Sequence, residues 1–96
     1  MRTVDYSTLF KRDFKREYRG QYRWLLEKGG EFDRIKYMLA NNIPLLPRYR
    51  DHPLHGKHEG SRECHVRPDL LLMYRLEGDE VLILERLGSH AELFGI

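Results

Sequence analysis

Residues 51–75 hold four of the five histidines, the only cysteine and two of the four prolines. Within this stretch Glu63 and His65 stand two apart in a short alternating segment, so both side chains should lie on the same face of a strand. Asp69 follows one short turn later, where it could orient or tune an imidazole. His90, the fifth histidine, lies in a second loop after the last predicted strand. We expect the two loops to meet and form an acid–base site.

Such a set of side chains suits the cleavage of RNA without a metal ion. A base removes the proton of the 2′-OH, which attacks the adjacent phosphorus, and an acid protonates the departing 5′-oxygen. A cation or hydrogen-bond donor steadies the charge on the phosphoryl oxygens. Histidine serves both proton transfers because its unperturbed pKa of about 6.5 is close to the working pH. We therefore predict an endoribonuclease that needs no cofactor.

A zinc site is the competing interpretation. Competent ligands lie within fourteen positions of one another, namely His52, His55, His58, Cys64 and His65. No CxxC pair is present to anchor a structural site, and a histidine in a loop is often only a polar surface residue. Cys64 is predicted to face the core, and Glu63 could be a plain surface carboxylate. Phe94 could pack on the core or stack a base beside the polar site.

Basic residues are concentrated in the first half of the chain. Residues 1–50 carry twelve Lys and Arg against six Asp and Glu, although the net charge of the chain is only +2. This distribution suggests a polyanion or an acidic protein as partner. Cations near the predicted site should contact phosphates and make binding dependent on salt. The candidates are Arg50, Lys57, Arg62, Arg67 and Arg86.

The elements that must position these side chains are readable from periodicity. Ser7 is a suitable N-cap for an amphipathic helix over residues 9–26, which Gly20 weakens midway and Gly29-Gly30 ends. A second helix over residues 32–39 should pack against the first as a hairpin. The predicted strands cover residues 3–6, 63–66, 70–76 and 81–87. The chain should thus be one α+β domain spanning residues 1–96, a helical hairpin on a small, mainly antiparallel four-stranded sheet in the order β-α-α-β-β-β.

Other classes of protein are excluded by composition. The longest apolar run has five residues, far below the roughly 18 that a membrane span requires, and the first residues lack the apolar segment of a secretory signal. A single cysteine cannot form an internal disulfide, which is typical of a reducing compartment. We expect a cytoplasmic protein.

Several motifs together resemble the YafQ branch of the RelE superfamily of toxins. They are Tyr49-Arg50-Asp51-His52-Pro53-Leu54, the segment Gly60-Ser61-Arg62-Glu63-Cys64-His65-Val66, the segment Pro68-Asp69-Leu70-Leu71-Leu72-Met73-Tyr74, and Leu84-Glu85-Arg86-Leu87-Gly88-Ser89-His90 followed by Leu93-Phe94-Gly95. The resemblance covers nearly the whole chain. It implies a RelE-like fold and a ribonuclease toxin of a type II toxin–antitoxin pair. The implied partners are messenger RNA, the ribosome and a cognate antitoxin.

The resemblance also assigns functional residues position by position. They are His52, Glu63, His65, Asp69, His90 and Phe94. Two departures from the family pattern stand out, because the family commonly has Asp at the place of Glu63 and often Trp at the place of Leu70. A ParE-like member of the same fold, which inhibits a topoisomerase without cutting RNA, is an alternative. That branch has no need for His65 and His90 beside a carboxylate.

Overall fold

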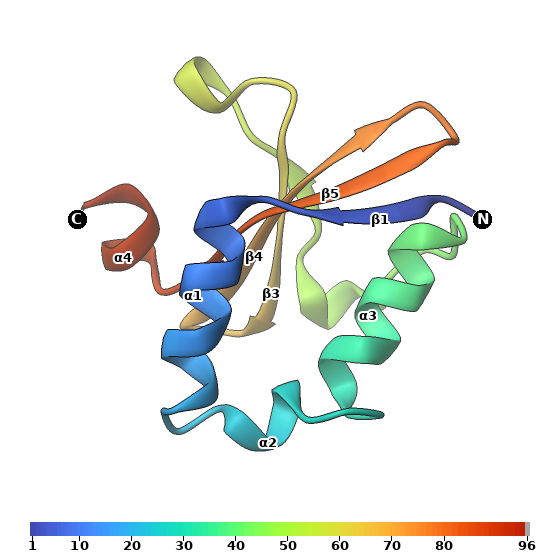
Figure 1. Cartoon of the computed structure of the whole chain (residues 1–96). Helices are drawn as coiled ribbons and strands as arrows, with labels where there is room; N and C mark the ends of the chain where they lie inside the picture. The colour runs from blue at the N-terminus through green and yellow to red at the C-terminus, as the bar shows by residue number, and fades with distance from the viewer. Residues whose placement is uncertain (96) are drawn as a thin grey trace.

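The computed structural model describes residues 1–95, and its strands form one twisted sheet (Figure 1). The order across the sheet is β1-β5-β4-β3-β2, with β1 parallel to β5 and the other pairs antiparallel. The strands are β1 (Thr3–Tyr6), β2 (His52–Pro53), β3 (Arg62–Arg67), β4 (Leu70–Glu77) and β5 (Val81–Gly88). The α+β class and the four predicted strands are confirmed.

The prediction of four strands was one too few, because β2 forms in the segment that we interpreted as the first loop. Its two residues pair with β3, His52 opposite Glu63 and Pro53 opposite Arg62. A two-residue strand is too short to show alternation in the sequence, and proline cannot donate to a ladder, so it marks an edge strand. This short pairing is what brings His52 to the site.

The first predicted helix is divided into two in the structure. Helix α1 (Thr8–Tyr18) ends just before Gly20, and a separate single turn, α2 (Arg23–Leu26), follows it. Ser7 caps α1 as expected, because its Oγ accepts a hydrogen bond from the Phe10 amide at 2.9 Å. Helix α3 (Glu31–Ala40) then runs back along the sheet. The helical hairpin is therefore α1 and α3 with α2 between them, and Gly20 ends the first helix rather than only weakening it.

The core lies between these helices and one face of the sheet. Helix residues such as Phe10, Leu25 and Ile35 pack against Cys64 and Leu84 of the strands, and all five are at most 2% exposed. The remaining elements are the 3-10 turns η1 (Pro47–Tyr49) and η2 (Gly56–His58) and the short helix α4 (His90–Phe94). Among the described residues, no helix has the length and apolar character to cross a membrane.

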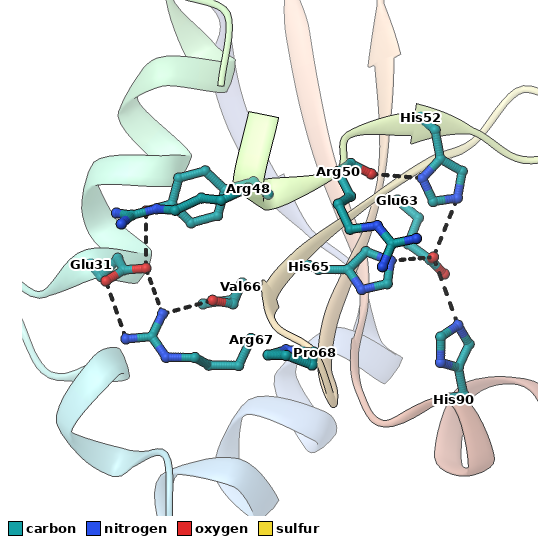
Figure 2. A pocket seen from close by; sticks show the side chains of 11 residues that line it. Glu31, Arg48, Arg50, His52, Glu63, His65, Val66, Arg67, Pro68 and His90 are labelled. Carbon is teal, nitrogen blue, oxygen red and sulfur yellow. Dashed lines mark hydrogen bonds and ion pairs between the residues drawn. The ribbon is translucent and has the colours of Figure 1, made fainter. Parts of the chain in front are cut away.

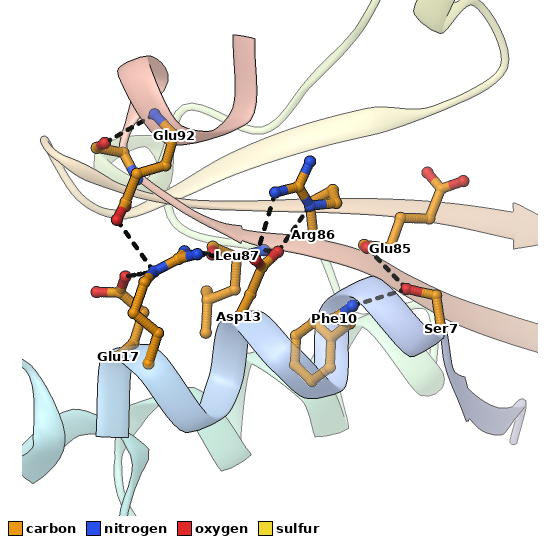
Figure 3. A network of polar contacts seen from close by, with 10 residues as sticks. Ser7, Phe10, Asp13, Glu17, Glu85, Arg86, Leu87 and Glu92 are labelled. Atoms are coloured by element: carbon orange, nitrogen blue, oxygen red, sulfur yellow. Dashed lines mark hydrogen bonds and ion pairs between the residues drawn. The ribbon is translucent and has the colours of Figure 1, made fainter. Parts of the chain in front are cut away.

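A buried ion pair fastens α1 to β5 (Figure 3). The fully buried carboxylate of Asp13 accepts hydrogen bonds from Arg86 Nε at 2.7 Å, from the Leu87 amide at 3.0 Å and from Arg16 Nη1 at 3.0 Å. Burial raises the pKa of Asp13, but the bonds from Arg86 and Leu87 outweigh it and hold the pKa below its usual value. The contact fixes the end of β5, from which the chain enters α4.

Candidate active site

One oxygen of a buried carboxylate faces three imidazole rings (Figure 2). Oε1 of Glu63 lies 3.4 Å from Nε2 of His52, 3.4 Å from Nε2 of His65 and 3.9 Å from Nε2 of His90. Glu63 is only 2% exposed, so it is not the plain surface carboxylate of the alternative interpretation. We call these four residues the histidine cluster.

Three different elements deliver the side chains of the histidine cluster. The pairing of β2 with β3 sets His52 directly opposite Glu63, and His65 is two residues further along β3 on the same face. His90 is the first residue of α4, which Ser89 and Glu92 cap reciprocally: Ser89 Oγ accepts from the Glu92 amide at 3.1 Å, and Glu92 Oε1 accepts from the Ser89 amide at 2.9 Å. The cap orients the start of α4 toward the sheet.

Hydrogen bonding settles where one proton of the cluster lies. Nδ1 of His52 is 2.7 Å from the carbonyl oxygen of Arg50, and a carbonyl can only accept, so Nδ1 carries the proton. A neutral His52 then presents a lone pair at Nε2 to the carboxylate of Glu63. That nitrogen, 3.4 Å from Glu63 Oε1, is thus the one through which His52 faces the cluster.

His65 is the most enclosed imidazole of the cluster. Burial lowers its pKa below the ordinary value, while the nearby carboxylate of Glu63 acts in the opposite direction and Arg50 adds to the lowering. His65 is thus held neutral near physiological pH, which is the state that a general base requires. Cys64 lies on the other face of β3, fully buried, and burial raises the pKa of its thiol, so it is a core residue as predicted.

A cavity of about 690 Å³ opens over the histidine cluster and continues away from it. Arg50 stands on its wall in the left-handed conformation, with φ at +49°, and is exposed. The far part of the wall is made by Glu31, Arg48, Tyr49 and Arg67. Of these, only Arg67 was a candidate from the sequence. The other three carry no local signal, because their place depends on how α3 and η1 pack.

Asp69 is not brought to the histidine cluster. It follows β3 at the turn into β4 and is exposed, and its carboxylate accepts a short hydrogen bond from the hydroxyl of Tyr22. It is absent from the residues that line the cavity. The carboxylate beside the imidazoles in this structure is thus Glu63 and not Asp69, and a role for Asp69 in the reaction stays a prediction.

Two of the predicted phosphate-binding cations have structural partners. Arg86 is bound to Asp13 beneath β5, as described above. Arg62 donates to Asp51 Oδ2 at 3.2 Å and to the Tyr74 hydroxyl at 3.3 Å. Because side chains alternate along β3, Arg62 lies on the core side rather than on the side of the cluster. Neither lines the cavity, although the sequence placed both among the cations of the cleft, and their contact with RNA stays a prediction.

Phe94 is half-buried beside the histidine cluster. Its ring centre is 5.8 Å from that of His90 and 5.3 Å from that of His58, and Leu93 rather than Phe94 is buried in the protein. Phe94 is thus in a place from which it could stack a base. Lys57 lies exposed in η2 and does not line the cavity.

A metal ion would find a different set of ligands from the one considered in the sequence. Ligand atoms of His52, Glu63 and His65 all lie within 4.8 Å of one another, and in residues 1–95 this is the one such group. Cys64 faces away from it, and His58 packs on Phe94. A cation there would take the same nitrogens that must carry protons in acid–base catalysis.

The sequence and the fold of this chain are both similar to those of known bacterial toxins. A sequence model described as a bacterial toxin of a type II toxin–antitoxin system, YafQ, matches residues 2–95. The mRNA interferase toxin YafQ of Escherichia coli K12 is 40% identical over 87 residues, 82% of this chain and 94% of that protein. YafQ in the E. coli DinJ–YafQ complex superposes with a TM-score of 0.80 at 38% identity, covering 99% of this chain and 100% of that one. A metal-bound toxin from Helicobacter pylori gives 0.82 at 39% identity, covering 98% and 100%. This chain therefore belongs to the YafQ family of bacterial toxins of type II toxin–antitoxin systems.

Proposed function

We propose that this protein is an mRNA endoribonuclease that cuts ribosome-bound messenger RNA in the cytoplasm and so inhibits translation. A cognate antitoxin would hold it inactive, as the pairing of E. coli YafQ with DinJ suggests. The observation that carries the proposal is the single buried carboxylate oxygen of Glu63 facing three imidazole nitrogens. The relatives named mRNA interferase support the choice of substrate.

The proposed reaction is internal attack by the substrate's own 2′-OH. His65, held neutral by burial, removes the 2′-OH proton as the oxygen bonds to phosphorus. His90, at the more open side of the histidine cluster, gives a proton to the 5′-oxygen as the bond from phosphorus to that oxygen breaks. One fragment then ends in a 2′,3′-cyclic phosphate and the other in a 5′-hydroxyl. No metal takes part in this scheme.

The other residues of the site stabilise the charges that form during the reaction and position the RNA. Glu63 stabilises the imidazolium that forms on His65 once it accepts the proton. His52, with Arg50 beside it, offers positive charge to the phosphoryl oxygens. Phe94 stacks a base next to His90. A ParE-like inhibitor of a topoisomerase would have no use for three imidazoles around one carboxylate, which favours the nuclease.

The deciding experiment uses a messenger RNA with one 2′-O-methyl group at the nucleotide whose 2′-OH would attack. Ribosomes programmed with this messenger should show no cleavage at that bond, whereas a 2′-O-methyl group two nucleotides away should leave cleavage intact. Fragment ends from the unmodified messenger should be 2′,3′-cyclic phosphate and 5′-hydroxyl. Cutting at the normal rate at the 2′-O-methyl position would overturn the mechanism.

A further inference from the structure

The cavity extends past the histidine cluster, and its far part is lined by different side chains. Figure 2 shows Val66 and Pro68 separating the cluster from a second group formed by Glu31, Arg48 and Arg67. Three arginines line the cavity as a whole, Arg48, Arg50 and Arg67, against two carboxylates. The far part therefore adds positive charge to the cavity beyond what the proposed cleavage step uses.

Arg67 is held in one orientation in this far part. Its Nη1 donates to Glu31 Oε2 at 2.8 Å and to the Val66 carbonyl oxygen at 2.8 Å, and its Nη2 lies 3.4 Å from Glu31 Oε1. The guanidinium carbon lies over the Trp24 ring, 5.2 Å from its centre, so the indole is a further neighbour that restricts the group. Tyr49 in turn fixes Glu31 by donating to Oε2 at 3.0 Å. A side chain so constrained loses little freedom when a ligand binds.

The ion pair of Arg67 with Glu31 lies at the wall of the cavity. The Arg67 side chain is 30% exposed and that of Glu31 13% exposed, and both line the cavity. Because Arg67 lines the cavity and is part-exposed there, a flat partner in the cavity can reach its guanidinium group. Arginine planes stack unpaired bases in RNA-binding proteins.

The distance along the strand fits a neighbouring nucleotide. Arg67 stands two residues beyond His65 on β3, so their backbones are about 6.6 Å apart along a regular strand. That is the scale of one nucleotide step in an extended single strand. A register irregularity lies between the two residues, and their side chains point to the two parts of the cavity (Figure 2). A phosphate at the histidine cluster would therefore place an adjacent base beside Arg67.

We propose that Arg67, held by Glu31 and Trp24, forms a second subsite that stacks the base of a nucleotide neighbouring the cleaved bond. The inference rests on the proposed function, since it places RNA in the same cavity. It makes Arg67 a substrate-positioning residue that is separate from the proton transfers. The base is held by stacking on the guanidinium plane, and charge attraction alone does not suffice.

Trp24 is the only tryptophan of the chain and is 61% exposed, so its fluorescence reports directly on this subsite. The probe is a five-nucleotide RNA with the sequence of a cleaved site, 2′-O-methylated at every position so that it cannot be cut. A set of variants of this probe lacks one base each. We expect the intact probe to change Trp24 fluorescence. Removing one base next to the cleaved bond should weaken binding about tenfold, the scale of one stacked base.

Substitution at Arg67 separates stacking from charge. In Arg67→Ala, removal of that base should no longer weaken binding, because the guanidinium group is gone. The same result is expected for Arg67→Lys, because lysine keeps the positive charge but lacks the planar guanidinium group on which a base stacks. Arg23→Ala, an exposed arginine on α2 outside the cavity, is the matched control and should keep the full base dependence. Because Arg67 touches Trp24, the fold of each variant is checked by circular dichroism and urea unfolding rather than by Trp24 emission.

The outcomes distinguish this subsite from the proposed function. The stacking subsite is wrong if the probe binds but removal of no single base weakens binding. It is also wrong if Arg67→Lys shows the same dependence on that base as the unaltered protein. In both cases the nuclease proposal stands. A probe that fails to bind although ribosome-bound messenger is cut also overturns the subsite, because its wall is already formed in the free chain. Failure to cut any messenger would instead count against the proposed function.

Discussion

Nε2 of His65 lies 3.4 Å from Oε1 of Glu63, while the other carboxylate oxygen of Glu63, Oε2, is buried without a hydrogen-bond partner among the described residues. An unpaired buried acceptor costs roughly 1–3 kcal/mol, more when it is charged. A fold that needed only stability would gain by replacing such a group. The arrangement is instead suited to a carboxylate that stabilises positive charge on imidazoles during a reaction.

Glu63→Gln should change the pH dependence of cleavage. The carboxylate of Glu63 raises the pKa of His65 against the stronger lowering by burial, so its removal should lower that pKa further. Activity that requires neutral His65 is lost as pH falls through this pKa, so the acidic limb should move to lower pH. The rate at pH 7 should fall by about 10²-fold. Single-turnover cleavage across pH 4–8 is the measurement, with exposed Glu80→Gln as control. An unmoved acidic limb would show that His65 is not the base.

His90→Ala should abolish most activity without unfolding the protein. Losing a general acid typically costs 10²–10⁴-fold in rate. The His90 side chain is 47% exposed, so little packing is lost with it. Growth arrest and messenger cleavage at matched expression test this, with exposed His55→Ala as the comparison. If His90→Ala still arrests growth fully, the assignment is wrong.

Divalent metal should inhibit cleavage. Ligand atoms of His52, Glu63 and His65 lie within 4.8 Å of one another, so Zn²⁺ or Cu²⁺ would bind nitrogens that must exchange protons. Adding such a cation should slow cleavage, and a chelator that leaves ribosomal magnesium in place should restore it. His52→Ala should weaken the inhibition. Activity that rises with added metal would contradict acid–base catalysis by free imidazoles.

Salt dependence should separate the cations in the cavity from those outside it. Arg50 lines the cavity beside the histidine cluster, whereas Lys57 is exposed elsewhere. Arg50→Ala should reduce the slope of log affinity against log salt by about 1, because one fewer counterion is released. Lys57→Ala should leave the slope unchanged. Equal slopes for Arg50→Ala and the unaltered protein would remove Arg50 from the binding site.

Asp13→Asn should destabilise the fold rather than affect chemistry. The variant leaves Arg86 without its buried partner, at a cost of about 3 kcal/mol. Because the pKa of Asp13 is lowered in the folded state, its contribution is present above the ordinary Asp range and is lost as pH falls through the folded value. Urea unfolding at pH 7 and pH 3 measures this, and the difference between variant and unaltered protein should shrink at pH 3. A variant as stable as the parent at pH 7 would contradict the structural role.

Local features of the chain were predictable because their physical cause is local. Alternation along one strand places Glu63 and His65 on the face opposite Cys64 and Val66, whatever the strand packs against. Ser7 caps α1 through an amide only three residues away. The resemblance of the motifs to one toxin family was confirmed by the match over residues 2–95.

Tertiary structure alone decided which charged groups meet. Arg86 and Asp13 are 73 residues apart in sequence, and only the packing of α1 on β5 joins them. Asp69 meets the hydroxyl of Tyr22, 47 residues away, and lies apart from the histidine cluster. Periodicity states which face a side chain occupies, but it does not encode the partner, because that depends on the register between strands and on the docking of helices distant in sequence.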